Sequence, residues 1–145
     1  MPLPYYRHKA HAERIALESS LPVTVLRSTQ FHTLLTQIFA SQRRLPGLLV
    51  AAMPVQPIDP GEVAQRLVEV VGQPPAGQAA DIGGPEVAPM SQFARQWLEA
   101  HARPLRQWPV RFPGRTFTAY RRGLHLADGP PYGTTTFAEH LERRD

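Results

Sequence analysis

The chain contains 145 residues, of which 42% are hydrophobic and 19% are charged, and no cysteine is among them. This length suits one domain covering residues 1–145, and the missing cysteines exclude disulfides and thiolate metal sites. The basic residues behind the net charge of +4 are fifteen arginines and a single lysine. Because no apolar run could span a membrane and no secretory signal is evident, we expect a cytoplasmic protein without membrane contact.

The first half of the chain alternates between helical and extended patterns. Residues 5–19 are good helix formers without an internal proline or glycine, and residues 31–41 repeat apolar side chains at helical spacing. Between them, LPVTVL at 21–26 is apolar on both faces, as in a buried parallel strand. Residues 48–58, LLVAAMPVQPI, predict one or two short strands broken at Pro54.

The clearest local signature lies at residues 59–62. Asp59 is a favourable N-cap, Pro60 suits the first helical position, and Glu62 stands where a capping box has its carboxylate. We therefore expect a helix that begins here and ends at Gly72. Its expected buried stripe consists of Val63, Ala64, Leu67, Val68 and Val71.

The second half continues the alternation. Residues 78–86 predict a turn or a strand, and we expect Ser91 to cap a helix that ends near Arg103. Residues 106–112 favour an extended segment, and residues 116–122 favour a short helix.

A second capping box is predicted near the end of the chain, where Thr136 precedes Phe137 and Glu139 follows three residues after the threonine. Helices alternating with short apolar strands indicate an α/β protein with a parallel component. No strand leads into a G-x-G-x-x-G turn, so the sequence lacks the usual cradle for a pyrophosphate.

Tyr5 and Lys9 lie four residues apart in the first predicted helix, which places their side chains on one face. A nearby ammonium group lowers the pKa of a tyrosine, as proton transfer to or from a carbonyl or hydroxyl group requires. The ammonium can also hold ribose hydroxyls. Because Tyr-x-x-x-Lys matches are common by chance, the alternative is a first-turn tyrosine and a surface lysine paired with Glu13.

Residues 5–32, YYRHKAHAERIALESSLPVTVLRSTQFH, resemble the Tyr/Lys helix and following strand of the short-chain dehydrogenase/reductase superfamily, in its atypical NmrA-like branch. PVQPIDPGEVA, DIGGPE and TTFAEHL occur downstream in the order and spacing of that family's second half, so the resemblance covers nearly the whole chain. It implies a partial Rossmann-like unit, made of the last parallel strands and helices of the sheet plus a small substrate-side subdomain.

The resemblance also implies roles for individual residues. Tyr5 would transfer a proton or polarise a carbonyl, and Lys9 would hold the nicotinamide ribose of NAD(P)H, so both are candidate catalytic and cofactor-binding residues. Thr29, Gln30 and Phe31 would line the loop that borders the nicotinamide and a small carbonyl-type substrate. The alternative for these three residues is ordinary packing of a loop and a helix start.

The family's Gly-rich phosphate loop and its first strands have no counterpart in this sequence. The resemblance therefore implies the C-terminal portion of such an oxidoreductase, lacking the N-terminal half and inactive as an isolated chain. An open edge at residues 21–26 and an incompletely covered first helix predict a homo-oligomer or a protein partner.

Two other functions remain open. A non-enzymatic regulatory module would use the same fold to bind a protein. An arginine-rich surface would bind nucleic acid, although no nucleic-acid motif is present and the aromatic residues are as easily core residues. His8 and His11 have no further ligand at a familiar spacing, so no metal site is expected. The residues that suggest nucleic-acid binding are Arg103, Arg106, Arg111, Arg115, Arg121 and Arg122, with Trp108, Phe112, Phe117 and Tyr120 among them.

Overall fold

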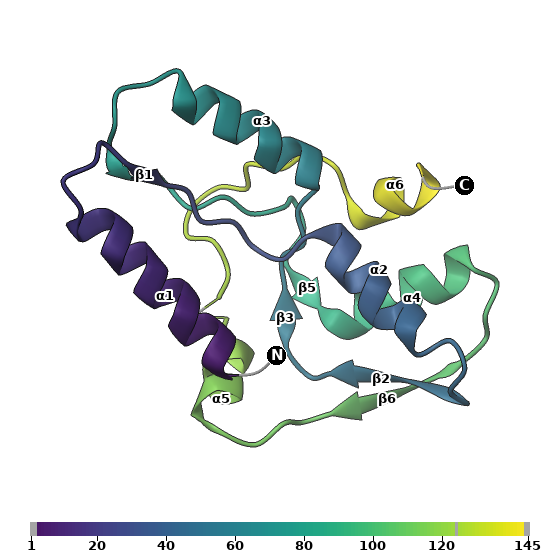
Figure 1. Ribbon diagram of the computed structural model, residues 1–145. Coiled ribbons are helices and arrows are strands. Elements are labelled where there is room, and N and C mark those ends of the chain that lie inside the picture. The colour runs from purple at the N-terminus through teal and green to yellow at the C-terminus, as the bar shows by residue number, and fades with distance from the viewer. Residues whose placement is uncertain (1–2, 124, 144–145) are drawn as a thin grey trace.

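The computed structural model describes the backbone of residues 3–123 and 125–143, and the side chains of residues 7–114, 117–123 and 125–143. Helices and short strands alternate along the chain, as an α/β protein requires (Figure 1). The helices are α1 Leu3–Glu18, α2 His32–Ser41, α3 Pro60–Val71, α4 Met90–Ala100, α5 Arg115–Arg121 and α6 Phe137–Glu142. The strands are β1 Thr24–Val25, β2 Gly47–Ala51, β3 Pro54–Val55, β4 Gly77–Gln78, β5 Ala88–Pro89 and β6 Arg106–Val110.

The strands form three separate pairs. β2 pairs with β6 in parallel over five residues, β1 pairs with β4 in parallel, and β3 pairs with β5 in antiparallel fashion. The predicted parallel component is therefore confirmed. The strand predicted over residues 21–26 is much shorter, because only Thr24 and Val25 pair and both are half-buried. A run of apolar residues does not become a long strand without a partner of equal length.

The main hydrophobic core lies between β2 and the helices α2, α4 and α6. Phe39, Phe93 and Phe137 are completely buried in it, and the rings of Phe93 and Phe137 meet edge to face at 5.5 Å. A smaller cluster of Ile58, Val63 and Ile82 forms a second, separate core. Figure 1 shows the two regions, with α2, α4 and β2 in one and α1, α3 and β1 in the other. No helix of the described residues is long and apolar enough to cross a membrane.

The helix predicted from Asp59 begins as expected. The Asp59 side chain accepts a hydrogen bond from the Gly61 backbone N–H at 2.7 Å, and Pro60 is the first helical residue. The predicted buried stripe is wrong, however, because only Val63 is buried, whereas Val68 is 74% exposed. Beyond its first turn, α3 contacts Tyr132 through Arg66 and Glu69, but most of its apolar residues there are exposed.

Two predictions about helix starts are also corrected. Ser91 does not cap α4, which begins at Met90 after Pro89 without a side-chain cap. Glu62 does not complete a capping box, because its carboxylate instead accepts hydrogen bonds from Thr134 and Thr135. The capping box at Thr136 and Glu139 is present as predicted. Residues in the first turn of a helix can thus bind a distant segment rather than their own helix end.

Candidate functional site

Two adjoining cavities, each of about 440 Å³, lie between the first and second halves of the chain. One is lined by charged, polar and apolar residues and is called the polar cavity; the other has an almost wholly apolar lining and is called the apolar cavity. Four residues line both cavities, so the two cavities share a wall. The shared wall consists of Gln30, Leu34, Tyr120 and His125.

The polar cavity contains most of the residues that the sequence nominated. Lys9 reaches it from α1, and Thr29, Gln30 and Phe31 line it from the segment that leads into α2. The structure thus brings four of the five candidates together. Tyr5 belongs to α1, but its side chain lies outside the described residues.

The loop of candidates is held in place by backbone hydrogen bonds to two other segments. The Thr29 N–H donates to the Ile82 carbonyl at 3.0 Å, and the Ile58 N–H donates to the Gln30 carbonyl at 2.8 Å. The Thr29 hydroxyl donates to the Gln56 carbonyl at 2.5 Å, so this side chain is engaged within the protein. Gln30 and Phe31 therefore present their side chains to the cavity from a fixed backbone.

The polar cavity is lined by three charged residues of the described chain, Lys9, Arg27 and Asp81. Arg27 forms an ion pair with Glu13 at 2.6 Å, and the hydrogen bond to Glu13 raises the pKa of this arginine. Asp81 also lines the cavity, and its charge contributes to raising the Arg27 pKa. Because Glu13 is the partner of Arg27, the surface Lys9–Glu13 pair considered from the sequence has a competitor for the same carboxylate.

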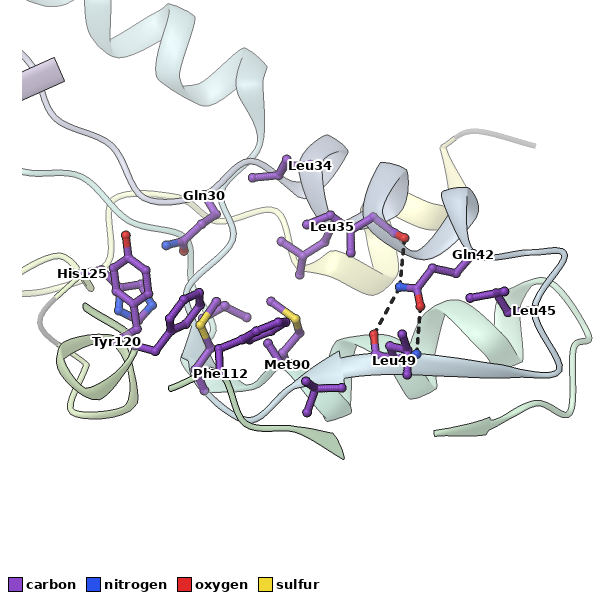
Figure 2. A pocket seen from close by; sticks show the side chains of 16 residues that line it. Gln30, Leu34, Leu35, Gln42, Leu45, Leu49, Met90, Phe112, Tyr120 and His125 are labelled. Carbon is purple, nitrogen blue, oxygen red and sulfur yellow. Dashed lines mark hydrogen bonds between the residues drawn. The ribbon is translucent and has the colours of Figure 1, made fainter. Parts of the chain in front are cut away.

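The apolar cavity is formed by α2, β2, β3, β6 and the segment around α5. Its lining includes Leu35, Leu49 and Phe117 but no charged side chain. The amide of Gln42, although it lines the cavity, is engaged by the backbone of Ile38 and Leu49. Figure 2 shows these hydrogen bonds at the end of the cavity that also holds Leu45.

His125 is a neutral residue in the shared wall. Its Nε2–H donates to the Pro54 carbonyl at 2.9 Å, and burial lowers the pKa of the imidazole despite this hydrogen bond. Tyr120 packs against it edge to face at 4.8 Å. Sequence reasoning missed both residues as parts of the site, because Tyr120 was grouped with the arginine-rich segment and His125 follows no motif.

Most aromatic residues of the arginine-rich segment lie at the apolar cavity. Phe112, Phe117 and Tyr120 all line the apolar cavity, and the rings of Phe112 and Phe117 stack at 4.8 Å. Trp108 is 41% exposed on β6. Three of the four aromatics that suggested a nucleic-acid surface therefore line a pocket.

The polar cavity fits one end of a nicotinamide cofactor, namely the nicotinamide with its ribose. The Lys9 ammonium and the Gln30 amide are suitable donors for ribose hydroxyls and a carboxamide. The adjoining glycines do not offer a phosphate cradle, because a Cβ on Gly84 would lie 1.7 Å from the Pro57 carbonyl oxygen. Gly83 and Gly84 thus serve close packing of the chain, and the described residues do not fit the pyrophosphate.

The comparisons with known proteins support the fold. No protein-family model and no curated protein matches this sequence. The chain is similar in structure to a nucleoside-diphosphate-sugar epimerase from Staphylococcus aureus, with 17% sequence identity, a TM-score of 0.67, and coverage of 92% of this chain and 56% of that one.

Two further similar structures contain bound NAD. A UDP-glucuronic acid 4-epimerase from Bacillus cereus in complex with NAD has 15% identity and a TM-score of 0.68, covering 98% of this chain and 51% of that one. A dTDP-glucose 4,6-dehydratase from Bacillus anthracis in complex with NAD has 16% identity and a TM-score of 0.63, covering 98% and 50%. The chain thus spans about half the length of these structures. The predicted α/β fold, a partial Rossmann-like unit, is confirmed.

Proposed function

We propose that this chain forms the substrate-side part of an NAD(P)H-dependent oxidoreductase of the short-chain dehydrogenase/reductase superfamily, in its NmrA-like branch. The observation that carries the proposal is the common cavity of Lys9, Thr29, Gln30 and Phe31, which shares a wall with a second, apolar cavity. A structural likeness to NAD-containing epimerases and dehydratases supports the same superfamily.

In this proposal Tyr5 and Lys9 act as a pair on α1. Tyr5 donates a proton to a substrate carbonyl, or accepts one from a hydroxyl, and the Lys9 ammonium lowers the pKa of the phenol. The same ammonium donates hydrogen bonds to the ribose hydroxyls of the cofactor. When bound, NAD(P)H would supply the hydride for reduction of a carbonyl, and NAD(P)⁺ would accept the hydride in oxidation of a hydroxyl. Gln30 and Phe31 border the space where nicotinamide and substrate meet.

We expect no pyrophosphate site among the residues of this sequence. The sequence has no G-x-G-x-x-G turn, and its adjacent glycines, Gly83 and Gly84, are packed against residues 56–58. We expect weak cofactor binding and no turnover from this chain alone, and full binding when a Gly-rich strand–loop–helix unit is joined to it.

The direct test is a titration of the chain with NADH and NADPH, followed by nicotinamide fluorescence and calorimetry. We expect saturable binding that Lys9→Gln weakens at least tenfold, because the variant removes the charged donor to the ribose. Arg14→Gln is the matched control, since Arg14 is an exposed cation of the same helix that does not line the polar cavity. An absence of binding at millimolar cofactor, or equal affinities for Lys9→Gln and Arg14→Gln, would contradict the proposal.

The exposed apolar faces favour a second candidate function, a regulatory module that binds a second copy of itself or another protein. On α3, Leu67, Val68 and Val71 are 48%, 74% and 84% exposed. Apolar side chains clustered in this way are typical of an interaction surface.

Self-association follows from this candidate function. In sedimentation velocity we expect concentration-dependent association of the wild-type chain and a shift toward monomer in Val68→Asp, because the new carboxylate would lose hydration in the interface. Gln65→Asp, an exposed change on the same helix, serves as the control for added charge. A chain that stays monomeric at all concentrations and unfolds at high temperature would count against this candidate.

A further inference from the structure

The apolar cavity, hereafter the chamber, separates its polar and apolar groups. Figure 2 shows Gln30, Tyr120 and His125 at one end and Leu45 and Leu49 at the other. The polar end is the wall shared with the Lys9 cavity. A ligand with a single polar end and an apolar body would match this arrangement, with its polar end directed toward the Lys9 cavity.

The chamber offers nothing to a charged ligand. Its lining contains no lysine, arginine or acidic side chain, and burial lowers the pKa of the His125 imidazole despite the opposing hydrogen bond from its Nε2–H to the Pro54 carbonyl. Gln42 is engaged by backbone groups, with the Leu49 N–H donating to its Oε1 at 2.9 Å. An anion would lose its hydration here without gaining a cationic partner, which is unfavourable.

The rim of the chamber exposes apolar side chains to solvent. Leu45, Leu49 and Phe112 are 43%, 44% and 43% exposed, although they come from three separate segments of the chain. A ligand that fills the chamber would cover parts of all three. Its volume of about 440 Å³ lies within the range typical of small-molecule sites.

We propose that the chamber binds the hydrocarbon body of an uncharged alcohol or carbonyl compound, whose oxygen lies at the end formed by Gln30 and Tyr120. The assignment of this oxygen as the reacting group rests on the function proposed above, whereas the binding of the apolar body does not. Nucleotide sugars are excluded as occupants of the chamber, because their diphosphate would have no cation in its lining.

A homologous series of alcohols tests the chamber without any cofactor. Butan-1-ol, hexan-1-ol and octan-1-ol are titrated into the full chain by calorimetry, and UDP-glucose is titrated separately. We expect the affinity to rise about fourfold for each added methylene, as burial of a CH₂ group predicts. UDP-glucose should neither bind in the millimolar range nor displace octan-1-ol. An affinity independent of chain length, or displacement of octan-1-ol by UDP-glucose, would overturn the proposal.

Variants at the rim locate the bound alcohol. Leu49→Asp should weaken octan-1-ol binding at least tenfold, because it introduces a carboxylate at the apolar end of the chamber. Leu21→Asp is the matched control, since Leu21 is 68% exposed and lines neither cavity. Leu45→Asp, outside the strands, is the second variant if circular dichroism shows that Leu49→Asp is unfolded. Wild-type affinity in a folded Leu49→Asp or Leu45→Asp chain would overturn the proposal.

The alcohol series and the cofactor titration test separate claims, so each result can reject one claim without rejecting the other. Chain-length-dependent binding of alcohols in a chain that binds no NAD(P)H would sustain the chamber and reject the oxidoreductase function. NAD(P)H binding that requires Lys9, in a chain with no preference for longer alcohols, would reject the chamber assignment alone. Octan-1-ol affinity should be unchanged in Lys9→Gln, since Lys9 lines only the polar cavity.

Discussion

Gly84→Ala is expected to prevent stable folding of this chain. A Cβ at position 84 would lie 1.7 Å from the carbonyl oxygen of Pro57 and 2.6 Å from its carbonyl carbon. These are backbone atoms, so the clash cannot be relieved by rotating a side chain. We expect a loss of about 4 kcal/mol or more in the free energy of unfolding, which is large compared with most substitutions.

The clash would also reach the candidate site. The segment that carries Gly84 is joined to Gln56 by a hydrogen bond from the glutamine amide to the Gly84 carbonyl at 3.0 Å. Next to it, the Ile82 carbonyl accepts the Thr29 N–H, and the Ile58 carbonyl accepts the His32 N–H. Separating these segments would release the loop that presents Gln30 and Phe31 to the polar cavity.

Thermal and urea unfolding followed by circular dichroism measure this effect. Gly72→Ala is the matched control, because Gly72 has a φ of −76° and the nearest atom to its added Cβ lies at 3.5 Å. We expect this control to be neutral or to stabilise the chain by up to about 1 kcal/mol. A Gly84→Ala chain that unfolds at the wild-type midpoint would show that the two segments are not in close contact.

Glu62→Ala is expected to lower the free energy of unfolding by about 2 to 3 kcal/mol, the range for hydrogen bonds to a charged group. Glu62 Oε1 accepts the backbone N–H groups of Thr134 and Thr135 at 2.8 and 3.0 Å, and both hydroxyls at 2.8 and 3.3 Å. Removing the carboxylate would leave the Thr135 N–H without this acceptor in a buried residue. The start of α6 would lose its connection to α3.

The same carboxylate makes stability depend on pH. Burial raises the pKa of Glu62, but the hydrogen bonds from Thr134 and Thr135 outweigh it, so the pKa in the folded chain is below its ordinary value. The stabilisation is therefore fully present above the unfolded-state pKa of about 4.3 and is lost as the pH falls through the lower folded-state pKa. Glu62→Gln should remove this part of the acid sensitivity while keeping an acceptor in place.

Urea unfolding of wild type and Glu62→Gln between pH 7 and pH 3 separates these effects. Glu99→Gln is the control, because Glu99 is an exposed carboxylate on α4. We expect the stability difference between wild type and Glu62→Gln to shrink as the pH falls, and the difference for Glu99→Gln to stay near zero. A difference for Glu62→Gln that is constant over this range would show that the charge of Glu62 does not act through these bonds.

Local signals in the sequence were sufficient for most helices and for the order of elements. The caps at Asp59 and Thr136 were identified because each depends on residues only two or three positions apart. The split of residues 48–58 into two strands followed from Pro54, which begins the second strand. The pairing of β2 with β6 joins residues almost sixty positions apart, and no local pattern specifies such a partner.

A family resemblance guided the choice of candidate site residues, and their roles stay a prediction. Lys9, Thr29, Gln30 and Phe31 were nominated from the sequence and line one cavity. The chamber was not predicted from the sequence, because its walls are ordinary apolar residues of α2, β2, β6 and α5 that any core would contain.

The sequence by itself determined the α/β character of this protein and the helix starts capped by Asp59 and Thr136. Only the tertiary structure decided which apolar faces are buried. Val63 and Val71 belong to one predicted helical stripe, but Val63 packs against Ile58 and Ile82, whereas Val71 is 84% exposed. The tertiary structure also decided that Glu62 binds the segment before α6 and that Gly84 must lack a side chain. These outcomes depend on what lies across space from a residue, whereas a sequence pattern reports only its neighbours along the chain.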